Sequence, residues 1–368
     1  MRLTMMLAAL ITLCATSVHA DEAPAERFHP YGDFRFRAEL TDFPQAPNRF
    51  RPRVRLRVGA VLDLGSGLHL GARVITGDPT DPRSAHQTLG EGGEGFTLSL
   101  DRVFIEWRPT KVKGLRLVGG KFPNAIERPA VVQGLVTDND VQPTGVLGQL
   151  KSRGPVSFDV SLGHYIMDEK PEGEDTVATV GQVGLRMGSA RKVQLRLFAD
   201  AFIMDIGDST TVDRLGHPTG RGNRVQDMRF VSDFHVVQLF AELETRAAGQ
   251  PLVFSAGGMR NLRAYEHKDD LGWFVGAMIG KIDGWGTGRA YLQVQQVEQE
   301  AVFTPWAQDE LPDDRGSRFR GVLGGTVLGL TSNMTVHTWV LASTLLSPGP
   351  SESSSWYGRF RLDLNVRF

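Results

Sequence analysis

Apolar and polar residues alternate almost strictly at the C-terminal end of the chain. One parity holds Phe360, Leu362, Leu364, Val366 and Phe368, and the other holds Arg359, Arg361, Asp363, Asn365 and Arg367. A strand with this pattern has one apolar face and one charged face. A soluble β-sandwich would explain this one strand equally well. The same pattern, however, recurs along the chain with short and long connections in alternation, which favours a transmembrane β-barrel.

The repeated alternation predicts an all-β fold, a transmembrane antiparallel up-and-down β-barrel of about 16 strands with short periplasmic turns and long extracellular loops. We place the upward strands near 31–40, 68–77, 114–122, 155–166, 193–204, 251–261, 287–299 and 334–345. The downward strands lie near 50–64, 96–108, 145–153, 176–189, 226–246, 271–282, 317–330 and 355–368.

The connections between these strands differ in length on the two sides of the predicted barrel. Short turns at 65–67, 153–155, 189–191 and 331–333 fall on the periplasmic side. Long segments at 77–95, 122–144, 205–225 and 300–316 fall on the other side and are rich in Gly, Pro, Asp and Glu, as surface loops are. The apolar phase is irregular in 96–108, 226–246 and 271–282, and β-bulges would explain the first two.

The chain begins with the features of an exported protein. Residues 1–20 resemble a cleaved signal peptide, with Arg2, an apolar core and a small-residue cleavage site ending at Ala20. We assign 21–30 as a short periplasmic segment and 31–368 as the barrel. The sole cysteine, Cys14, lies in the signal peptide, so no disulfide is expected in the mature chain. No later stretch reaches the roughly 18 apolar residues of a membrane helix, which leaves a closed barrel to span a bilayer.

The N-terminal third resembles the putative porin family, the single-chain β-barrel porins of the outer membrane of Gram-negative bacteria. The resemblance rests on 32–37 (Gly-Asp-Phe-Arg-Phe-Arg), 53–57 (Arg-Val-Arg-Leu-Arg), 100–102 with Trp107, 120–122 (Gly-Lys-Phe) and 138–140 running to Gly145. It departs from the family at 123–125 and 137–140. The family implies passive diffusion through a water-filled channel, without a defined solute or binding residue.

Arginines at strand periodicity are the strongest candidates for a functional site. Their neighbours Phe34, Phe36, Val54 and Leu56 occupy the opposite face, and an arginine facing lipid costs about 2 to 4 kcal/mol at the midplane. We therefore predict a basic lumenal wall that governs selectivity. Its members are Arg35, Arg37, Arg53, Arg55, Arg57, Arg318, Arg320, Arg359 and Arg361. The alternative is that these arginines pair with Glu39, Asp63, Asp101 and Asp363 and only stiffen the barrel.

The loop at 122–144 is a candidate constriction. It carries Glu127, Asp138 and Asp140, and in general porins the third long loop folds inward with its acids facing an arginine cluster. By analogy, these acids would create a transverse field that favours polar solutes over apolar ones. An extracellular excursion that caps the pore from outside is an equally good prediction.

Other residue types add little chemistry. Aromatic residues near strand ends, among them Trp107, Trp273, Trp285 and Trp356, fit interface girdles, while Trp306 lies in a long loop where it could contact solute or lipopolysaccharide. The acidic clusters at 78–81 and 309–314 match no calcium loop and are expected to be solvated. No catalytic motif, metal site or cofactor motif is present in the sequence.

The sequence therefore predicts an outer-membrane porin that passes small polar solutes and ions by diffusion, with a mild anion preference. The alternatives are a substrate-selective channel for anionic solutes, an outer-membrane barrel enzyme or an adhesion scaffold. The expected partners are outer-membrane lipid and lipopolysaccharide, small polar or anionic solutes, and the barrel-assembly machinery, which would recognise Phe368 as the end of the last strand. No nucleic acid is expected. The oligomeric state stays open, with a homotrimer as one alternative.

Overall fold

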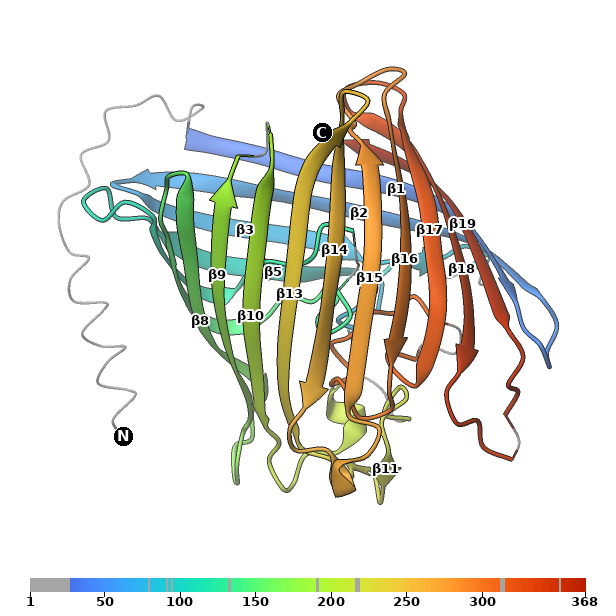
Figure 1. Cartoon of the computed structure of the whole chain (residues 1–368). Helices are drawn as coiled ribbons and strands as arrows, with labels where there is room; N and C mark the ends of the chain where they lie inside the picture. The colour runs from blue at the N-terminus through green and yellow to red at the C-terminus, as the bar shows by residue number, and fades with distance from the viewer. Residues whose placement is uncertain are drawn as a thin grey trace.

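A computed structural model describes residues 27–368 except residues 79, 91, 94, 132–133, 190–191, 216–218, 312–314 and 351. The predicted signal peptide lies outside the described residues. Seventeen strands form one sheet, and without the two-residue strand β4 (Gln87–Thr88) the remaining sixteen make a closed antiparallel barrel (Figure 1). The closure pairs β1 with β19. The predicted fold class is thereby confirmed.

The barrel strands follow one another around the wall in chain order. They are β1 (Phe28–Asp42), β2 (Arg49–Gly65), β3 (Leu68–Thr76), β5 (Leu98–Trp107), β6 (Leu115–Lys121), β7 (Thr144–Lys151), β8 (Val156–Asp168), β9 (Thr176–Gly188), β10 (Gln194–Asp205), β13 (Phe234–Ala247), β14 (Gln250–Asn261), β15 (Leu271–Gly280), β16 (Gly288–Val297), β17 (Phe319–Gly329), β18 (Met334–Leu345) and β19 (Tyr357–Arg367). Their positions agree closely with the strands predicted from alternation.

Two strand starts differ from the prediction. β1 begins at Phe28, within the segment that we had assigned to the periplasm. β13 begins only at Phe234, because the preceding residues form the small hairpin of β11 (Val225–Gln226) and β12 (Arg229–Phe230). Asp227 and Met228 between them have φ of 50° and 62°, so the backbone reverses here instead of continuing a strand.

The first irregular segment contains the predicted β-bulge. In β3 and β5, Arg73 pairs with Arg102 while Val74 pairs with Leu100, so Asp101 is the extra residue. β13, in contrast, pairs with both neighbours without a register shift. The bulge predicted for that strand is therefore wrong, and its phase is unclear in the sequence because apolar residues occupy both faces.

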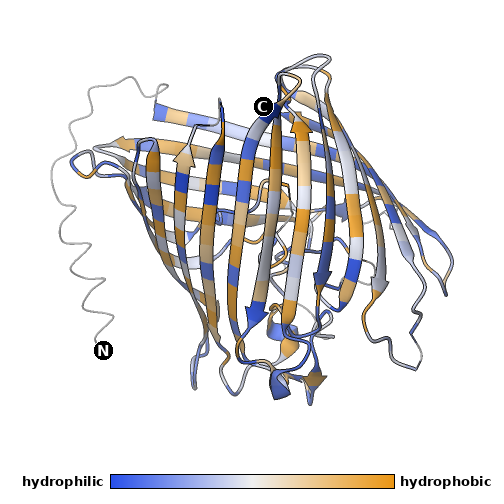
Figure 2. Cartoon of the chain, in the orientation of Figure 1, coloured by the Kyte–Doolittle hydropathy of each residue, from blue (hydrophilic) through white to orange (hydrophobic). Residues whose placement is uncertain are grey.

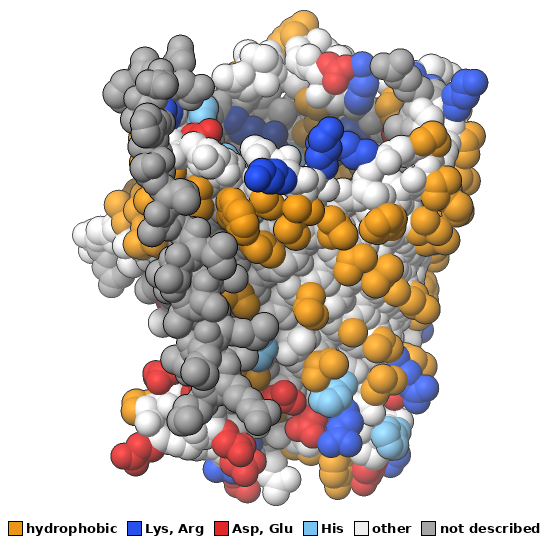
Figure 3. All heavy atoms as spheres, turned by 90° about the vertical axis from the view of Figure 1, so that its left-hand side faces the viewer, with side chains coloured by type: hydrophobic (Ala, Val, Ile, Leu, Met, Phe, Trp, Pro, Cys, Tyr) orange, Lys and Arg blue, Asp and Glu red, His pale blue; other side chains and the backbone are white. Residues whose placement is uncertain are grey.

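The outer surface is apolar around the wall. Side chains such as Leu162 on β8, Leu239 on β13 and Val340 on β18 point outward and are more than half exposed. Figure 2 shows the alternating colours along each strand, and Figure 3 shows the apolar residues gathered over the wall with charged residues concentrated toward the loops. Among the described residues, no helix is long and apolar enough to cross a membrane.

The inside of the barrel is partly filled by the described residues of two long connections, 122–143 and 298–318. Phe122, Leu135, Phe303 and Leu311 from these segments are almost fully buried. They join a cluster with inward residues of the wall, among them Phe274 of β15. Figure 1 shows these connections inside the wall. One half of the lumen is therefore an apolar packing surface for loops, and the polar half lies on β1, β2 and β19.

Candidate functional site

The polar half of the lumen is built by three adjacent strands around the barrel closure. Arg35 and Arg37 on β1 lie directly opposite Arg55 and Arg53 on β2. On the other side, Arg37 is opposite Asp363 of β19. Since alternate residues of a strand share a face, the apolar neighbours point to the lipid side and the charged side chains converge inside.

Several of these arginines are held by buried carboxylates. Arg37 donates two hydrogen bonds to Asp363, at 2.8 and 2.9 Å. Arg361 donates to Glu39 at 2.7 Å, and its guanidinium lies 4.6 Å from the centre of the Trp339 ring. The wall is thus an ion-pair ladder as well as a row of positive charge.

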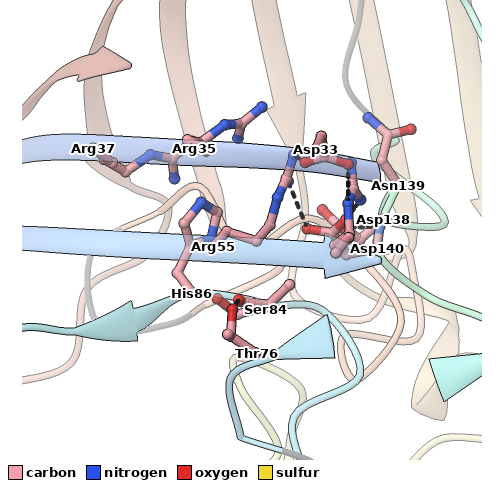
Figure 4. Close-up of polar contacts among 12 residues, drawn as sticks. Asp33, Arg35, Arg37, Arg55, Thr76, Ser84, His86, Asp138, Asn139 and Asp140 are labelled. Carbon is pink, nitrogen blue, oxygen red and sulfur yellow. Dashed lines mark hydrogen bonds and ion pairs between the residues drawn. The ribbon is translucent and has the colours of Figure 1, made fainter. Parts of the chain in front are cut away.

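At the periplasmic end of the ladder, Asp33 connects the first two strands. Its carboxylate accepts hydrogen bonds from Arg55 at 2.7 Å and from Arg57 at 2.6 Å. Arg57 also donates to Asp140 at 3.0 Å, and Arg55 lies 3.7 Å from that same carboxylate. In Figure 4 the residues 138–140 lie beside Asp33.

Two further arginines donate their hydrogen bonds to neutral groups. Arg53 donates to the Ser84 hydroxyl at 3.2 Å and the His86 carbonyl at 3.3 Å. Arg35 donates through Nε to Asn365 at 2.6 Å and lies 3.6 Å from Asp363. In the part of the chain that the structure describes, no hydrogen bond of the terminal Nη groups of Arg35 is found, and Arg35 lines the lumenal cavity.

Arg359 also lies on the wall, but the predictions for Arg318 and Arg320 are wrong. Arg359 is buried and donates to Thr41 at 3.1 Å and to the Glu310 carbonyl at 2.9 Å. Arg318 precedes β17 with φ of 65° and binds Glu352 at the loop end. Arg320 is exposed and shares the outward face of β17 with Val322.

The segment 122–143 lies inside the barrel and contributes two acids to this site. Asp138 is buried, and one of its oxygens accepts the Asp140 N–H at 2.7 Å. Burial, together with repulsion from Asp309 and Asp140, raises the pKa of Asp138 well above its ordinary value. Burial opposes ionisation of Asp140 as well, but Arg55 and Arg57 outweigh it and lower its pKa.

Glu127 does not face the arginine wall, which corrects our prediction. Its carboxylate binds Lys151 at 2.6 Å and Arg186 at 3.0 Å, on β7 and β9. Its N–H donates to Gln182 at 2.9 Å. The physical reason is that the apolar residues of the loop pack toward that half of the lumen and carry Glu127 with them. Although burial works against it, these two cations lower the pKa of Glu127.

The second inward segment supplies acids that the sequence did not reveal. Glu310 forms an ion pair with Arg361, and Asp309 lines the same cavity. Both belong to the cluster at 309–314 that we expected to be solvated. The available signal was the run of apolar residues just before it, Ala301-Val302-Phe303, which is buried.

These groups surround a cavity of about 300 Å³. Its basic side is formed by Arg35, Arg37, Arg55, Arg57 and Arg361, and its acidic side by Asp138, Asp140, Asp309 and Glu310; Asp363, His86, His337, Trp339 and Asn139 complete the lining. His86 is buried, and its Nε2 has no hydrogen-bond partner among the described residues. Burial and the nearby arginines lower the pKa of His86 well below its ordinary value. The cavity is therefore mainly polar and is charged on two sides, and Trp339 is its large aromatic lining residue.

The alternative prediction was that the arginines pair with Glu39, Asp63, Asp101 and Asp363, and it agrees with part of the ladder. Asp363, Glu39 and Asp101 all bind arginines, with Arg73 as the partner of Asp101. Asp63 instead lies in the periplasmic turn region, 3.9 Å from His69.

The tryptophans that we predicted to form the interface girdles are exposed. Trp306, which we placed in a long loop, has a different environment. Trp107, Trp273, Trp285 and Trp356 are all more than two-fifths exposed. Trp306 lies inside, with its ring centre 6.2 Å from that of Tyr165, and its carbonyl accepts the Asp138 N–H at 2.6 Å. It therefore joins the two inward segments to each other.

The closed sixteen-stranded barrel with inward loops has the porin fold. It is similar to OprB of Pseudomonas putida in a high-pH structure, with a TM-score of 0.62 and 14% identity over 94% of this chain and 95% of that one. It is also similar to Salmonella typhi OmpF, solved in complex with daunomycin, with a TM-score of 0.54 and 11% identity over 93% of this chain and 97% of that one. At this identity the likeness concerns the fold.

The family assignment comes from sequence. Residues 43–197 match the family described as putative porin, which confirms the resemblance predicted from the N-terminal motifs. No curated protein sequence matches the chain. Family and fold together support an outer-membrane porin channel rather than an enzyme.

Proposed function

We propose that this protein is an outer-membrane porin that passes small polar solutes and ions by diffusion, with a mild preference for anions. The observation that carries the proposal is the cavity of about 300 Å³ between the arginine ladder and the acids of the inward segments. Opposed charges across a narrow aqueous passage create a transverse field, which orders water and disfavours apolar solutes. The surplus donors of Arg35 favour anions.

Single-channel recording tests this proposal directly. The full mature chain, refolded into a planar lipid bilayer, should give stepwise open currents in potassium chloride. Across a salt gradient, the reversal potential should have the sign of an anion-preferring pore. A folded barrel that stays silent at all voltages would contradict the proposal and favour an enzyme or an adhesion scaffold.

A second candidate function is selective transport through a binding site for anionic solutes such as phosphate, sugar acids or carboxylates. It is favoured by the Nη groups of Arg35 and by the buried Nε2 of His86, which offer hydrogen bonds within one cavity. Conductance that saturates with anion concentration would support it. Conductance that rises linearly to high concentration would rule it out.

The proposal includes the surroundings of the barrel. The exposed apolar wall would contact outer-membrane lipid and lipopolysaccharide, and the last strand would engage the assembly machinery. Removal of residues 1–20 and a homotrimeric assembly are further predictions, which N-terminal sequencing and the mass of the detergent-solubilised complex would test.

A further inference from the structure

The segment 298–318 is fixed to the wall and to the neighbouring inward segments. The Glu310 carbonyl accepts from Arg359 at 2.9 Å. The fully buried Arg83 donates to the carbonyls of Thr304 at 3.2 Å and Gln308 at 3.3 Å. The described part of this segment therefore has a defined position in the lumen, and Asp309 and Glu310, which follow Gln308, line the cavity.

Three of the four acids on this side of the cavity present little negative charge to a passing ion. Asp140 is shared with Arg57 and Arg55, and Glu310 is paired with Arg361. When an arginine is in direct contact with a carboxylate, its positive charge cancels most of the electric field that the carboxylate would exert on an ion farther away. Asp138 is buried and bound to a backbone N–H, and its raised pKa favours the neutral acid.

Asp309 differs from these acids. Its side chain is partly exposed and lines the cavity. In the described part of the chain, no hydrogen bond or ion pair of its carboxylate is found. It lies close enough to Arg37, Arg53 and Arg361 to interact with their charges, but it is not in contact with any of them.

We propose that Asp309 is the specificity-determining acid of the pore and sets the balance between cation and anion passage. An ionised carboxylate without a partner attracts cations and repels anions along its stretch of the passage, and so limits the anion preference that the arginines create. The dominant acid thus comes from the segment 298–318 and not from 122–143. This inference rests on the proposed diffusion function.

The test compares reversal potentials of the wild type and Asp309→Asn in planar bilayers across a potassium chloride gradient. We expect the anion-to-cation permeability ratio to rise about threefold or more, because one unit charge that lines the ion path is removed. Asp138→Asn should leave the ratio unchanged at a pH below the raised pKa of Asp138. Asp283→Asn is the matched control, because Asp283 is exposed and pairs with Lys281 in a turn away from the cavity.

A cysteine variant separates the charge of this residue from its shape. The chain has one natural cysteine, Cys14, in the predicted signal peptide. In Asp309→Cys, a negatively charged methanethiosulfonate reagent should restore the wild-type ratio, and a positively charged one should raise it further. Both reagents should leave the wild type unchanged.

The outcomes distinguish the two proposals. Absence of channels in the wild type would remove the diffusion function itself. Wild-type channels whose selectivity is the same in Asp309→Asn, and in both forms of the modified cysteine variant, would overturn the role of Asp309 alone. The cysteine series also decides the case if Asp309→Asn folds poorly.

Discussion

Arg57 of β2 and Asp140 of the segment 122–143 meet at 3.0 Å across the lumen. Arg57 is also held by Asp33 on β1, so the wall presents a guanidinium that is already positioned for the loop. The contact therefore ties the inward segment to the polar half of the barrel, opposite the half on which its apolar residues pack.

Removing the hydrogen bond between Arg57 and Asp140 should make the segment 122–143 more mobile. We expect Asp140→Asn to lower the free energy of unfolding by about 1.5 to 3 kcal/mol, the range for hydrogen bonds to charged groups. The open-channel current should become larger and noisier. Urea unfolding in lipid vesicles and single-channel recording measure the two effects. Asp63→Asn, at a partly exposed turn acid, is the control; equal effects of both substitutions would contradict a tethering role.

Arg35 and Arg37 should respond differently to neutralisation although they are two residues apart. Arg37→Gln leaves the buried Asp363 carboxylate poorly compensated, and breaking such a pair costs about 3 to 5 kcal/mol. Arg35→Gln should be far less destabilising, since Arg35 binds Asn365 and only approaches Asp363 at 3.6 Å. It should instead lower the anion-to-cation permeability ratio about threefold.

The measurements for this pair are urea unfolding and the reversal potential. Arg35→Lys, which keeps the positive charge, is the matched control for selectivity. If Arg35→Gln unfolds as readily as Arg37→Gln and leaves the reversal potential unchanged, Arg35 has a structural role and not a selective one.

The barrel could be predicted from the sequence because a lipid-facing strand has to alternate. Where apolar and charged residues occupy fixed parities, as on β1 and β19, the lumenal arginines Arg35, Arg37, Arg359 and Arg361 follow directly. β17 carries several glycines and apolar residues on both faces, so its phase was ambiguous and Arg320 was placed on the wrong face.

The contents of the lumen could not be predicted in the same way. Phe240 of β13 and Phe274 of β15 point inward and are buried. If the inner face of a strand is assumed to line a water-filled pore, such inward apolar residues make the alternation of apolar and polar positions look irregular. Apolar residues of a loop far away in sequence, such as Ile126 and Leu135, line a common pocket with Phe274. Non-local packing therefore decided where Glu127 and Asp309 point. The apolar run 301–303 is a nearby sequence signal for Asp309, whereas Glu127 has no such signal.

Selectivity should change with pH through Asp138. Its pKa is raised well above the ordinary value of 3.8 by burial and by the nearby carboxylates of Asp309 and Asp140. As the pH rises through this raised pKa, the side chain ionises, adds negative charge to the cavity and lowers the anion preference. Reversal potentials recorded at increasing pH measure the change, and Asp138→Asn should flatten it.

The free energy of unfolding should also depend on the protonation of Asp138. A carboxyl whose pKa is higher in the folded state binds more protons there than in the unfolded chain, so its stabilising contribution is complete below 3.8 and is lost as the pH rises through the folded-state pKa. Asp138→Asn should therefore reduce the loss of stability as the pH rises from 3.8 through the folded-state pKa. A profile identical to that of the wild type would rule out Asp138 as the titrating group.

The terminal residue Phe368 should matter for closure and assembly. Its backbone exchanges hydrogen bonds with Gly32 at 2.8 and 3.1 Å, and its exposed ring lies against Gly32, where an added Cβ would be 2.4 Å away. Deleting Phe368 should lower the yield of folded, membrane-inserted barrel, measured by the heat-dependent gel shift of membrane fractions. Phe360→Ala, which removes an outward phenylalanine from the same strand, is the control and should assemble normally.

We expect apolar packing to hold the segment 298–318 in the lumen independently of the ion pairs that the segment forms. Phe303 is 1% exposed and packs against Phe230 and Phe234 with ring centres 5.4 and 5.3 Å away. We expect Phe303→Ala to cost about 3 to 5 kcal/mol in urea unfolding, as the burial of an aromatic ring implies, and to raise conductance because the segment gains freedom to leave the passage. Trp285→Ala, at a ring that is 79% exposed in a turn, should do neither. If Phe303→Ala lowers stability but leaves conductance and selectivity unchanged, the segment does not narrow the pore, whatever it contributes to the fold.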